Sequence, residues 1–256
     1  MKPKRILNLT INEFLLSITR GTLFVLMIIS LSAFSQKEVS WDYPIKPGSE
    51  KWKTFLTGQE MVTACQIPND ILANLSTSEL ARICLNYPLF FLYTASTNER
   101  EAIVSMINEF NGLSELSQRE DCLKELRKLY QNTSIVKHGD KKDNAQSAVY
   151  QMVFLELLLS NNIFSSNAHG RELEELEKVF LEKYNDKLQH QDVYSLYSIS
   201  KSLLLGAVIY SKQDSLVHGR NLHMRKVKYF IDNYENANST ELTEISQILT
   251  SDEESK

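Results

Sequence analysis

The sequence has few of the residues that define several special classes of protein. Only three of its 256 residues are cysteine, so the chain cannot be a disulfide-dense scaffold. Eight glycines and five prolines are too few for a collagenous or low-complexity chain, and an apolar content of 43% is too high for a disordered one. A net charge of −4 offers no basic surface for nucleic acid. We therefore expect a globular protein with a buried core and no nucleic-acid partner.

Residues 1–35 have the pattern of a secretion signal. Basic residues at the start are followed by an apolar stretch from Gly21 to Phe34, and Ala33 and Ser35 are the small residues that a signal peptidase requires. At 14 residues this stretch is shorter than the ~20 that a membrane-spanning helix needs. We predict cleavage between Ser35 and Gln36 and export to the periplasm, cell surface or medium, with membrane contact only during export. The alternative is an uncleaved anchor.

The chain after this leader is predicted to be helical. The residues from Leu89 to Lys256 contain no proline, and glycines separate blocks of apolar residues at helical spacing. Such stretches indicate helices joined by short loops. We predict an all-α protein of about nine to eleven antiparallel helices, arranged as hairpins in a multi-helix array. The pattern leaves open whether this array is a closed bundle or a short α-solenoid. It covers residues 49–236, and the polar stretch 131–142 is the best candidate for a joint within it.

The segment before this helical domain is predicted to be extended. Residues that precede proline are driven to extended backbone, so Pro44 and Pro47 place residues 36–48 in a strap. Its apolar side chains, Tyr43 among them, are expected to pack on helices. The segment after the domain, 237–256, is polar and acidic and is predicted to be a frayed tail, unless its few apolar residues dock.

Several helix ends carry recognisable signals. Thr57 with Glu60, and Ser76 with Glu79, fit the capping box, in which a side chain and a backbone group bond reciprocally. The pair Asn111-Gly112 is typical of a left-handed cap that ends a helix. These signals predict two helix starts and one helix end.

Five separated elements occur in order in the first half of the chain: Tyr43-Pro44-Ile45-Lys46-Pro47-Gly48-Ser49-Glu50 with Trp52, Cys65-Gln66-Ile67-Pro68, Leu75-Ser76-Thr77 with Leu80, Cys84-Leu85-Asn86-Tyr87-Pro88, and Phe110-Asn111-Gly112-Leu113. Together they resemble the start of a family of exported bacterial proteins, uncharacterised in function and known from gut-type anaerobes. The resemblance covers residues 43–116. It implies secretion and a helical fold, and it implies no catalytic residues.

Three of the five histidines, His138, His169 and His218, stand directly before a glycine. One hypothesis is a zinc site that these histidines assemble from three loops. The other is that histidine and glycine both suit helix ends, where the cation complements the terminal carbonyls. We favour the second hypothesis because the spacings between these histidines match no known spacing of zinc ligands. No metal and no cofactor are therefore predicted.

Cys65, Cys84 and Cys122 fall on or near positions that face inward. In an oxidising compartment Cys65 and Cys84 would bridge neighbouring helices, closing a loop of about 20 residues worth ~3 kcal/mol in chain entropy. The alternative is three buried thiols that serve as small apolar residues. We favour this alternative because an odd number of cysteines leaves at least one thiol free in any case.

The remaining motifs are few. The tripeptide Asp214-Ser215-Leu216 matches a short acceptor pattern for O-glycosylation in exported bacterial proteins, which makes Ser215 a candidate site. No nucleophile elbow, phosphate loop or dinucleotide fingerprint is present, so no catalytic residue is assigned. We expect a non-enzymatic exported protein that mediates protein–protein interaction with an unknown partner protein. The alternatives are a hydrolase or metal-dependent enzyme with a loop-built site, and a small-molecule carrier with an interhelical pocket.

Overall fold

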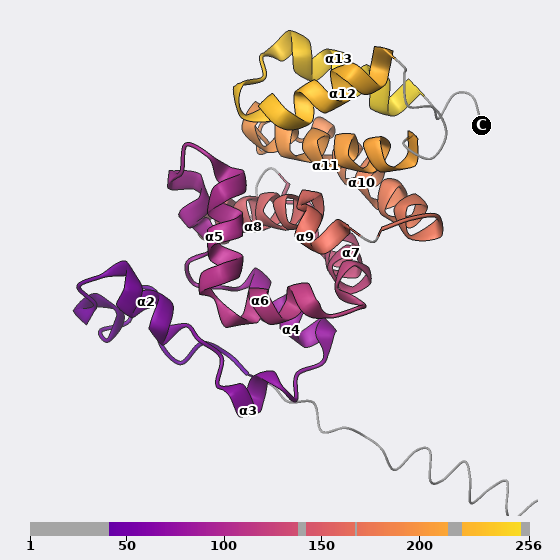
Figure 1. Cartoon of the computed structure of the whole chain (residues 1–256). Coiled ribbons are helices and arrows are strands. Elements are labelled where there is room, and N and C mark those ends of the chain that lie inside the picture. Colours follow the sequence, from indigo (N-terminus) through magenta and orange to yellow (C-terminus); the bar gives the residue numbers. More distant parts are fainter. Residues whose placement is uncertain (1–40, 138–141, 167, 215–221, 252–256) are drawn as a thin grey trace, which may run out of the picture. The chain divides into compact units, whose positions relative to one another are not determined.

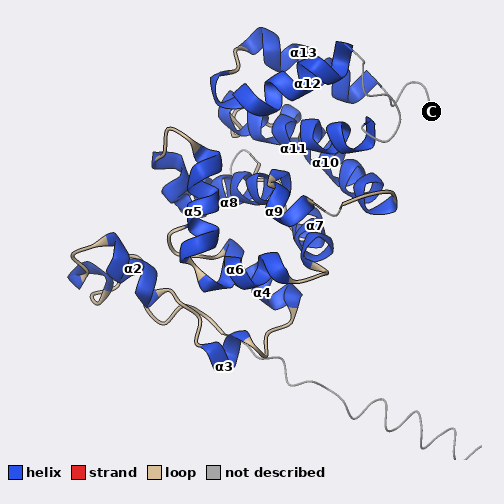
Figure 2. Cartoon of the chain, in the orientation of Figure 1, coloured by secondary structure: helices blue, strands red, loops and turns tan. Residues whose placement is uncertain are grey.

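The regular secondary structure of the described residues is entirely helical (Figures 1 and 2). The computed structural model describes residues 41–137, 142–166, 168–214 and 222–251. Contacts divide the chain into two units, Met1–Val39 and Ser40–Lys256, and all the described residues belong to the second. The all-α prediction is confirmed. The predicted leader and its cleavage point, Ser35 and Gln36, lie outside the described residues, and no helix among those described has the length and apolarity to span a membrane.

Twelve α-helices and three short 3-10 helices make up the described part of the chain, slightly more elements than expected. The α-helices are α2 Gly58–Ala64, α3 Asn69–Leu72, α4 Thr77–Leu85, α5 Glu99–Glu109, α6 Asn111–Gln118, α7 Cys122–Asn132, α8 Lys142–Ser160, α9 Asn162–Ser165, α10 Arg171–Gln189, α11 Leu196–Asp214, α12 Leu222–Asn233 and α13 Ser239–Thr250. The 3-10 helices are η1 Trp52–Thr54, η2 Phe90–Ala95 and η3 Tyr234–Asn236.

Both predicted capping boxes are present. The side chain of Thr57 accepts a hydrogen bond from the backbone of Glu60, whose side chain accepts one from the backbone of Thr57. Ser76 and Glu79 form the same reciprocal pair at the start of α4. Each box satisfies backbone donors that the first helical turn leaves unpaired, which stabilises the helix start by ~1 kcal/mol.

Gly112 has a different role from the one predicted. Helix α5 ends at Glu109, Phe110 has extended backbone, and α6 already begins at Asn111, so Gly112 lies in the first turn of a helix. A Cβ atom at Gly112 would lie 2.5 Å from Cζ of Phe110. The close approach of the Phe110 ring therefore requires this glycine, whereas a left-handed backbone does not. An Asn-Gly pair in the sequence is compatible with both situations.

The described part of the strap is fastened to α4 by Tyr43. Its side chain is 4% exposed, and its hydroxyl donates to the carbonyl oxygen of Ile83 at 2.9 Å. The ring lies 4.7 Å from that of Trp41 and 6.3 Å from those of Tyr87 and Phe110, measured between centroids. Tyr87 and Phe110 themselves stack at 4.2 Å. These aromatic contacts join the strap to α4 and to the α5–α6 junction, as the expectation for Tyr43 required.

The segment proposed as a joint, 131–142, connects α7 to α8. Val136 within it is buried, and its backbone N–H donates to the hydroxyl oxygen of Tyr194 at 2.9 Å. Helix α7 contacts both α8 and α10, and Ser40–Lys256 is one compact unit. The described part of the segment is thus anchored to the residues that precede α11.

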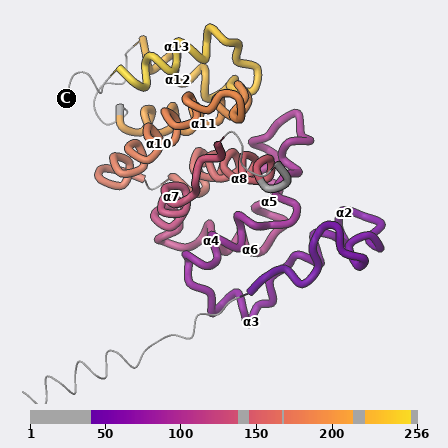
Figure 3. Tube along the Cα trace, turned by 180° about the vertical axis from the view of Figure 1, so that it is seen from behind, coloured from indigo at the N-terminus to yellow at the C-terminus, as the bar shows by residue number. Residues whose placement is uncertain are grey.

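Helix α11 is surrounded by other helices. It packs against α8, α10, α12 and α13, and it lies beside α10 in both views (Figures 1 and 3). Gly206 near its middle permits this packing, because a Cβ atom there would lie 2.4 Å from Cζ of Phe180 and 2.9 Å from Cδ1 of Leu249. Because helices cover α11 on several faces, its apolar residues are not confined to one stripe. Residues 201–209 are all buried.

Helix α13 occupies most of the segment that was expected to be a tail, 237–256. The side chain of Asn238 accepts hydrogen bonds from the backbone of Thr240 and Glu241, and Glu241 completes a capping box. The helix buries four apolar side chains, Leu242, Ile245, Ile248 and Leu249. Its polar residues lie between these positions, so the segment is an amphipathic helix in spite of its acidic composition. Residues 252–256 lie outside the described part.

Candidate functional site

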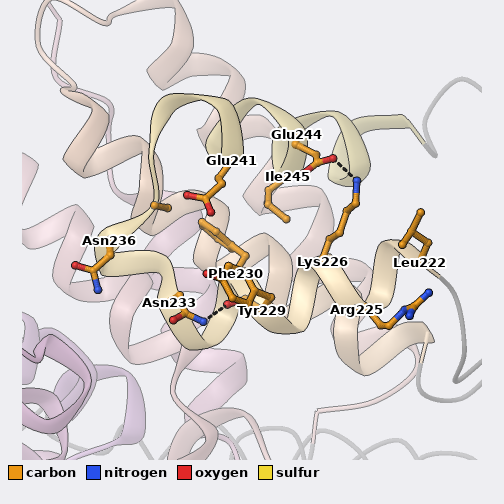
Figure 4. Close-up of a pocket in the computed structure, with 11 residues that line it drawn as sticks. Leu222, Arg225, Lys226, Tyr229, Phe230, Asn233, Asn236, Glu241, Glu244 and Ile245 are labelled. Carbon is orange, nitrogen blue, oxygen red and sulfur yellow. Dashed lines mark hydrogen bonds and ion pairs between the residues drawn. The ribbon is translucent and has the colours of Figure 1, made fainter.

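A groove with a volume of about 460 Å³ lies between α12 and α13 (Figure 4). Phe230 and Ile245, which are 3% and 2% exposed, contribute its apolar lining. Two large apolar side chains that also line it, Tyr229 and Leu222, are 61% and 55% exposed. Exposed aromatic and aliphatic side chains beside an apolar recess are typical of binding surfaces. The groove is therefore our candidate functional site.

The two walls of the groove carry opposite charges. Helix α12 contributes Arg225 and Lys226, whereas α13 contributes Glu241 and Glu244. Lys226 and Glu244 form an ion pair across the groove (Figure 4). Glu241 accepts a hydrogen bond from the backbone of the preceding cap residue at 2.8 Å. Arg225 is exposed, and within the described residues no carboxylate forms an ion pair with it.

Local sequence signals hold the two walls in place. The side-chain amide of Asn233, the last residue of α12, donates to the carbonyl oxygen of Tyr229 at 2.8 Å and so satisfies a carbonyl in the final turn. Helix η3 then leads to Asn238, which caps α13. The sequence thus defines a helix end, a single turn and a helix start in close succession. The helix end at Asn233 and the helix start at Asn238 bound the short connection between the two walls of the groove.

A buried ion pair lies among α7, α8, α10 and α11. Nζ of Lys187 is 2.7 Å from both carboxylate oxygens of Glu156, and neither side chain is exposed. Tyr130 and Ser202 donate hydroxyl hydrogen bonds to the same carboxylate at 2.8 Å. Burial lowers the pKa of Lys187 and raises the pKa of Tyr130. These groups satisfy one another, so this cluster joins helices and offers no polar group to a ligand.

A second buried ion pair joins α5 to α11. Nζ of Lys201 lies 2.9 Å from the carboxylate of Glu99, which is 5% exposed as a residue. Tyr197 donates to the same carboxylate at 2.6 Å, and the Lys201 ammonium lies 4.4 Å and 4.7 Å from the ring centroids of Tyr197 and Tyr234. Burial and the Glu99 charge raise the pKa of both tyrosines. Both phenols therefore remain protonated and act as hydrogen-bond donors.

Of the three histidines of the hypothetical zinc site, only His169 lies within the described residues. His169 is exposed and directly precedes the glycine N-cap of α10, whose φ is 52°, so this His-Gly pair starts a helix and does not end one. The ring that meets terminal carbonyls is that of His190, whose Nδ1 donates to the carbonyl oxygen of Asp186 at 2.8 Å. His138 and His218 lie outside the described residues, as does Ser215. Among the described side chains, no group of three or more His, Cys, Asp or Glu is placed to hold a metal ion.

All three cysteines are free and buried. Burial raises the pKa of the Cys65 thiol to about 11 and raises that of Cys84 further. Both thiols lie near Tyr43, whose own pKa is raised chiefly by burial and further by these two neighbours. Cys65 and Cys84 are not bridged in the structure, and their redox state in solution stays a prediction.

The groove was not found from the sequence. Its α12 residues recur at helical spacing, at Leu222, Arg225, Lys226, Tyr229 and Asn233. The aromatic residue that is buried, Phe230, is a direct neighbour of the one that is exposed. The apolar spacing of Val227, Phe230 and Tyr234 indicates that Phe230 faces the core, but it does not show that the exposed Tyr229 lies beside a recess. Only the position of α13 makes the exposed one part of a recess.

Together the described residues define an all-α protein with a mixed-charge apolar groove between its last two helices. Comparison with models of protein families, with curated proteins and with solved structures gives no match. The function is therefore argued from the chemistry of the groove.

Proposed function

We propose that this chain is an exported, non-enzymatic helical protein that binds a segment of another protein in the groove between α12 and α13. One observation carries the proposal: Tyr229 is 61% exposed at a recess whose lining residue Phe230 is buried. Tyrosine is among the residues that supply most of the binding energy at protein interfaces, because it adds large contact area with little loss of conformational freedom.

The charges of the groove indicate the chemistry of the partner segment. Lys226 already pairs with Glu244, whereas Arg225 has no carboxylate partner among the described residues. An apolar side chain of the bound segment would contact Phe230 and Ile245, and an acidic one would offer Arg225 a charge-assisted hydrogen bond. The proposed partner segment therefore combines a large apolar residue with an acidic one.

Export forms part of the proposal and rests on the pattern of residues 1–35. The proposal also includes the likeness of residues 43–116 to an exported family, and the arrangement of the helices as a hairpin array behind an N-terminal strap. The last is supported by Tyr43, which joins the strap to α4. N-terminal sequencing of protein recovered outside the cytosol tests export. We expect Gln36 as the first residue, and intact Met1 in the cytosolic fraction would contradict it.

Selection of random displayed peptides on the purified protein tests the groove. We expect enriched peptides to share a large apolar residue close to Asp or Glu. Binding should fall about tenfold or more for Tyr229→Ala, which removes an exposed anchor, and for Arg225→Glu, which reverses the charge. Tyr229 and Arg225 are both exposed, so neither change should lower the stability.

Lys228→Glu is the matched control, because Lys228 is exposed on α12 and does not line the groove. It should leave peptide binding unchanged. The proposal fails if no peptide is enriched, or if Lys228→Glu weakens binding as much as Arg225→Glu. It also fails if the protein is a dimer that Tyr229→Ala converts to a monomer, because the occupant would then be a second copy.

A further inference from the structure

The exposed apolar residues of the groove follow one face of α12. Leu222 and Tyr229, which are 55% and 61% exposed, are seven residues apart, and Arg225 lies between them, three residues after the first and four before the second. Positions with these spacings share a face of an α-helix. Because a helix rises about 1.5 Å per residue, the two apolar residues are about 10 Å apart along its axis. A bound segment therefore meets a stripe with an apolar residue at each end and a cation between them (Figure 4).

The walls of the groove offer few partners for the backbone of a bound segment. Both walls are α-helices, whose N–H and C=O groups bond within the helix. At the connection between them, the N–H of Ala237 donates to the carbonyl oxygen of Tyr234 at 3.3 Å, and that of Asn238 donates to the carboxylate of Glu241 at 2.8 Å. An extended segment would bury unpaired N–H and C=O groups in the apolar recess, at a cost in free energy. A helical segment pairs these groups internally, so the groove favours a helix.

The charged groups of the groove differ in what they leave for a ligand. Lys226 is paired with Glu244, and Glu241 accepts from the backbone at the start of α13. Arg225 is exposed and has no carboxylate partner in the described part of the chain. Its guanidinium would form charge-assisted hydrogen bonds with a carboxylate. The charge that complements the groove is therefore an acidic group in the middle of the stripe.

We propose that the segment bound in this groove is an amphipathic α-helix of about three turns that carries an acidic residue within its apolar face. This inference rests on the proposed function, and it adds the conformation of the partner and the place of its charge. A helix of three turns has about 11 residues and a length of about 16 Å, which covers the distance from Leu222 to Tyr229. Isolated helices of this length are marginally stable in water, so the segment gains its helical structure on binding.

Synthetic peptides of about 15 residues test the conformation of the bound segment. The parent peptide has leucines at helical spacing on one face, a glutamate within that face, and alanine and glutamine elsewhere. We expect it to bind the purified protein, measured by fluorescence anisotropy of the labelled peptide, and to gain helical circular dichroism on binding. A second peptide with proline in place of the central alanine should bind about a hundredfold more weakly, since proline is strongly unfavourable inside a helix.

Variants of the protein test where the helix lies. Leu222→Ala and Tyr229→Ala should each weaken binding of the parent peptide about tenfold, because a helix that runs along α12 contacts both residues. Arg225→Glu should weaken it by a similar factor. A third peptide, with lysine in place of the glutamate, should bind Arg225→Glu more tightly than it binds the unmodified protein. Lys228→Glu, at an exposed position of α12 outside the groove, is the matched control and should bind every peptide as the unmodified protein does.

Equal binding of the proline peptide and the parent peptide would overturn this inference, because the groove would then accept an extended segment while the proposed function still held. The inference is also overturned if Leu222→Ala leaves binding unchanged, or if Arg225→Glu does not favour the lysine peptide. If the parent peptide does not bind at all, the helix is again excluded. The proposed function fails with it only if the selection of displayed peptides also yields no binder.

Discussion

The ammonium group of Lys187 lies 2.7 Å from both carboxylate oxygens of Glu156, in a place where neither side chain has any exposed surface. Replacing Lys187 alone by methionine would leave the Glu156 carboxylate buried with two hydroxyl donors and no cation. We expect Lys187→Met to lower the free energy of unfolding by ~3–5 kcal/mol, the usual cost of breaking such a pair. Urea denaturation followed by circular dichroism measures this loss.

The double variant Lys187→Met with Glu156→Gln separates charge burial from packing. A neutral amide keeps an oxygen that accepts from Tyr130 and Ser202, and it removes the uncompensated charge. We expect the double variant to regain more than half of the stability that Lys187→Met loses. Equal destabilisation of the single and double variants would mean that packing, and not charge, decides the effect.

Gly206→Ala tests whether close packing or helix propensity controls α11. Alanine is favoured over glycine in a helix by about 1 kcal/mol, yet its Cβ would lie 2.4 Å from the buried ring of Phe180. Overpacking costs ~1–3 kcal/mol, so we expect Gly206→Ala to lower the melting temperature. Gly58→Ala is the matched control in α2, where a Cβ meets nothing within 4 Å. It should be neutral or stabilising, and a stabilising Gly206→Ala would contradict the packing of α10 on α11.

Alkylation of the cysteines tests both their redox state and their burial. Without reductant, the denatured protein should show three free thiols by mass, and a loss of two hydrogens would instead indicate one disulfide, which peptide mapping would assign to Cys65–Cys84 or to another pair. In the native state Cys65 has its pKa raised to about 11 from an ordinary 9.0, so its thiolate is ~100-fold scarcer than that of an ordinary thiol near neutral pH. Because Cys65 also has no exposed surface, its alkylation in the native protein should be far slower than in the denatured protein.

The raised pKa of Cys65 also makes the stability of the fold depend on pH. A thiol whose pKa is higher in the folded state favours folding while it is protonated. The contribution of Cys65 is therefore complete below about pH 9 and is lost as the pH rises to about 11. Cys65→Ala should reduce the decrease in melting temperature across this interval. An identical pH profile for the variant would contradict the assignment.

Leu249→Ala tests the position of α13. Leu249 is buried, and its Cδ1 is one of the atoms that approach Gly206, so the truncation should cost ~2–5 kcal/mol. Gln247→Ala on the exposed side of the same helix should change the stability by less than ~0.5 kcal/mol. Chemical denaturation of the two variants provides the comparison. If the end of the chain were a frayed tail, both substitutions would be neutral.

Much of the helical fold could be predicted, because its signals are local. The capping pairs Thr57–Glu60 and Ser76–Glu79 depend on residues three apart in the chain, and their geometry follows from the backbone of one helical turn. Where a signal has two physical causes the prediction fails. Gly112 was assigned to a helix end, yet it is required by the approach of a neighbouring ring. Residues 237–256 were likewise predicted to be a frayed tail because of their acidic composition, although four apolar residues at helical spacing are buried there.

By itself the sequence determined that this protein is made of helices, where several of them begin, and that Tyr43 joins the strap to them, because capping, proline placement and apolar spacing act within a few residues. The tertiary structure decided which side chains of those helices meet. The α12–α13 groove depends on how two consecutive helices pack, and the buried ion pair of Glu156 and Lys187 depends on helices that are distant in the chain. Local signals cannot supply this information, since the same amphipathic stripe is core when a helix covers it and surface when none does.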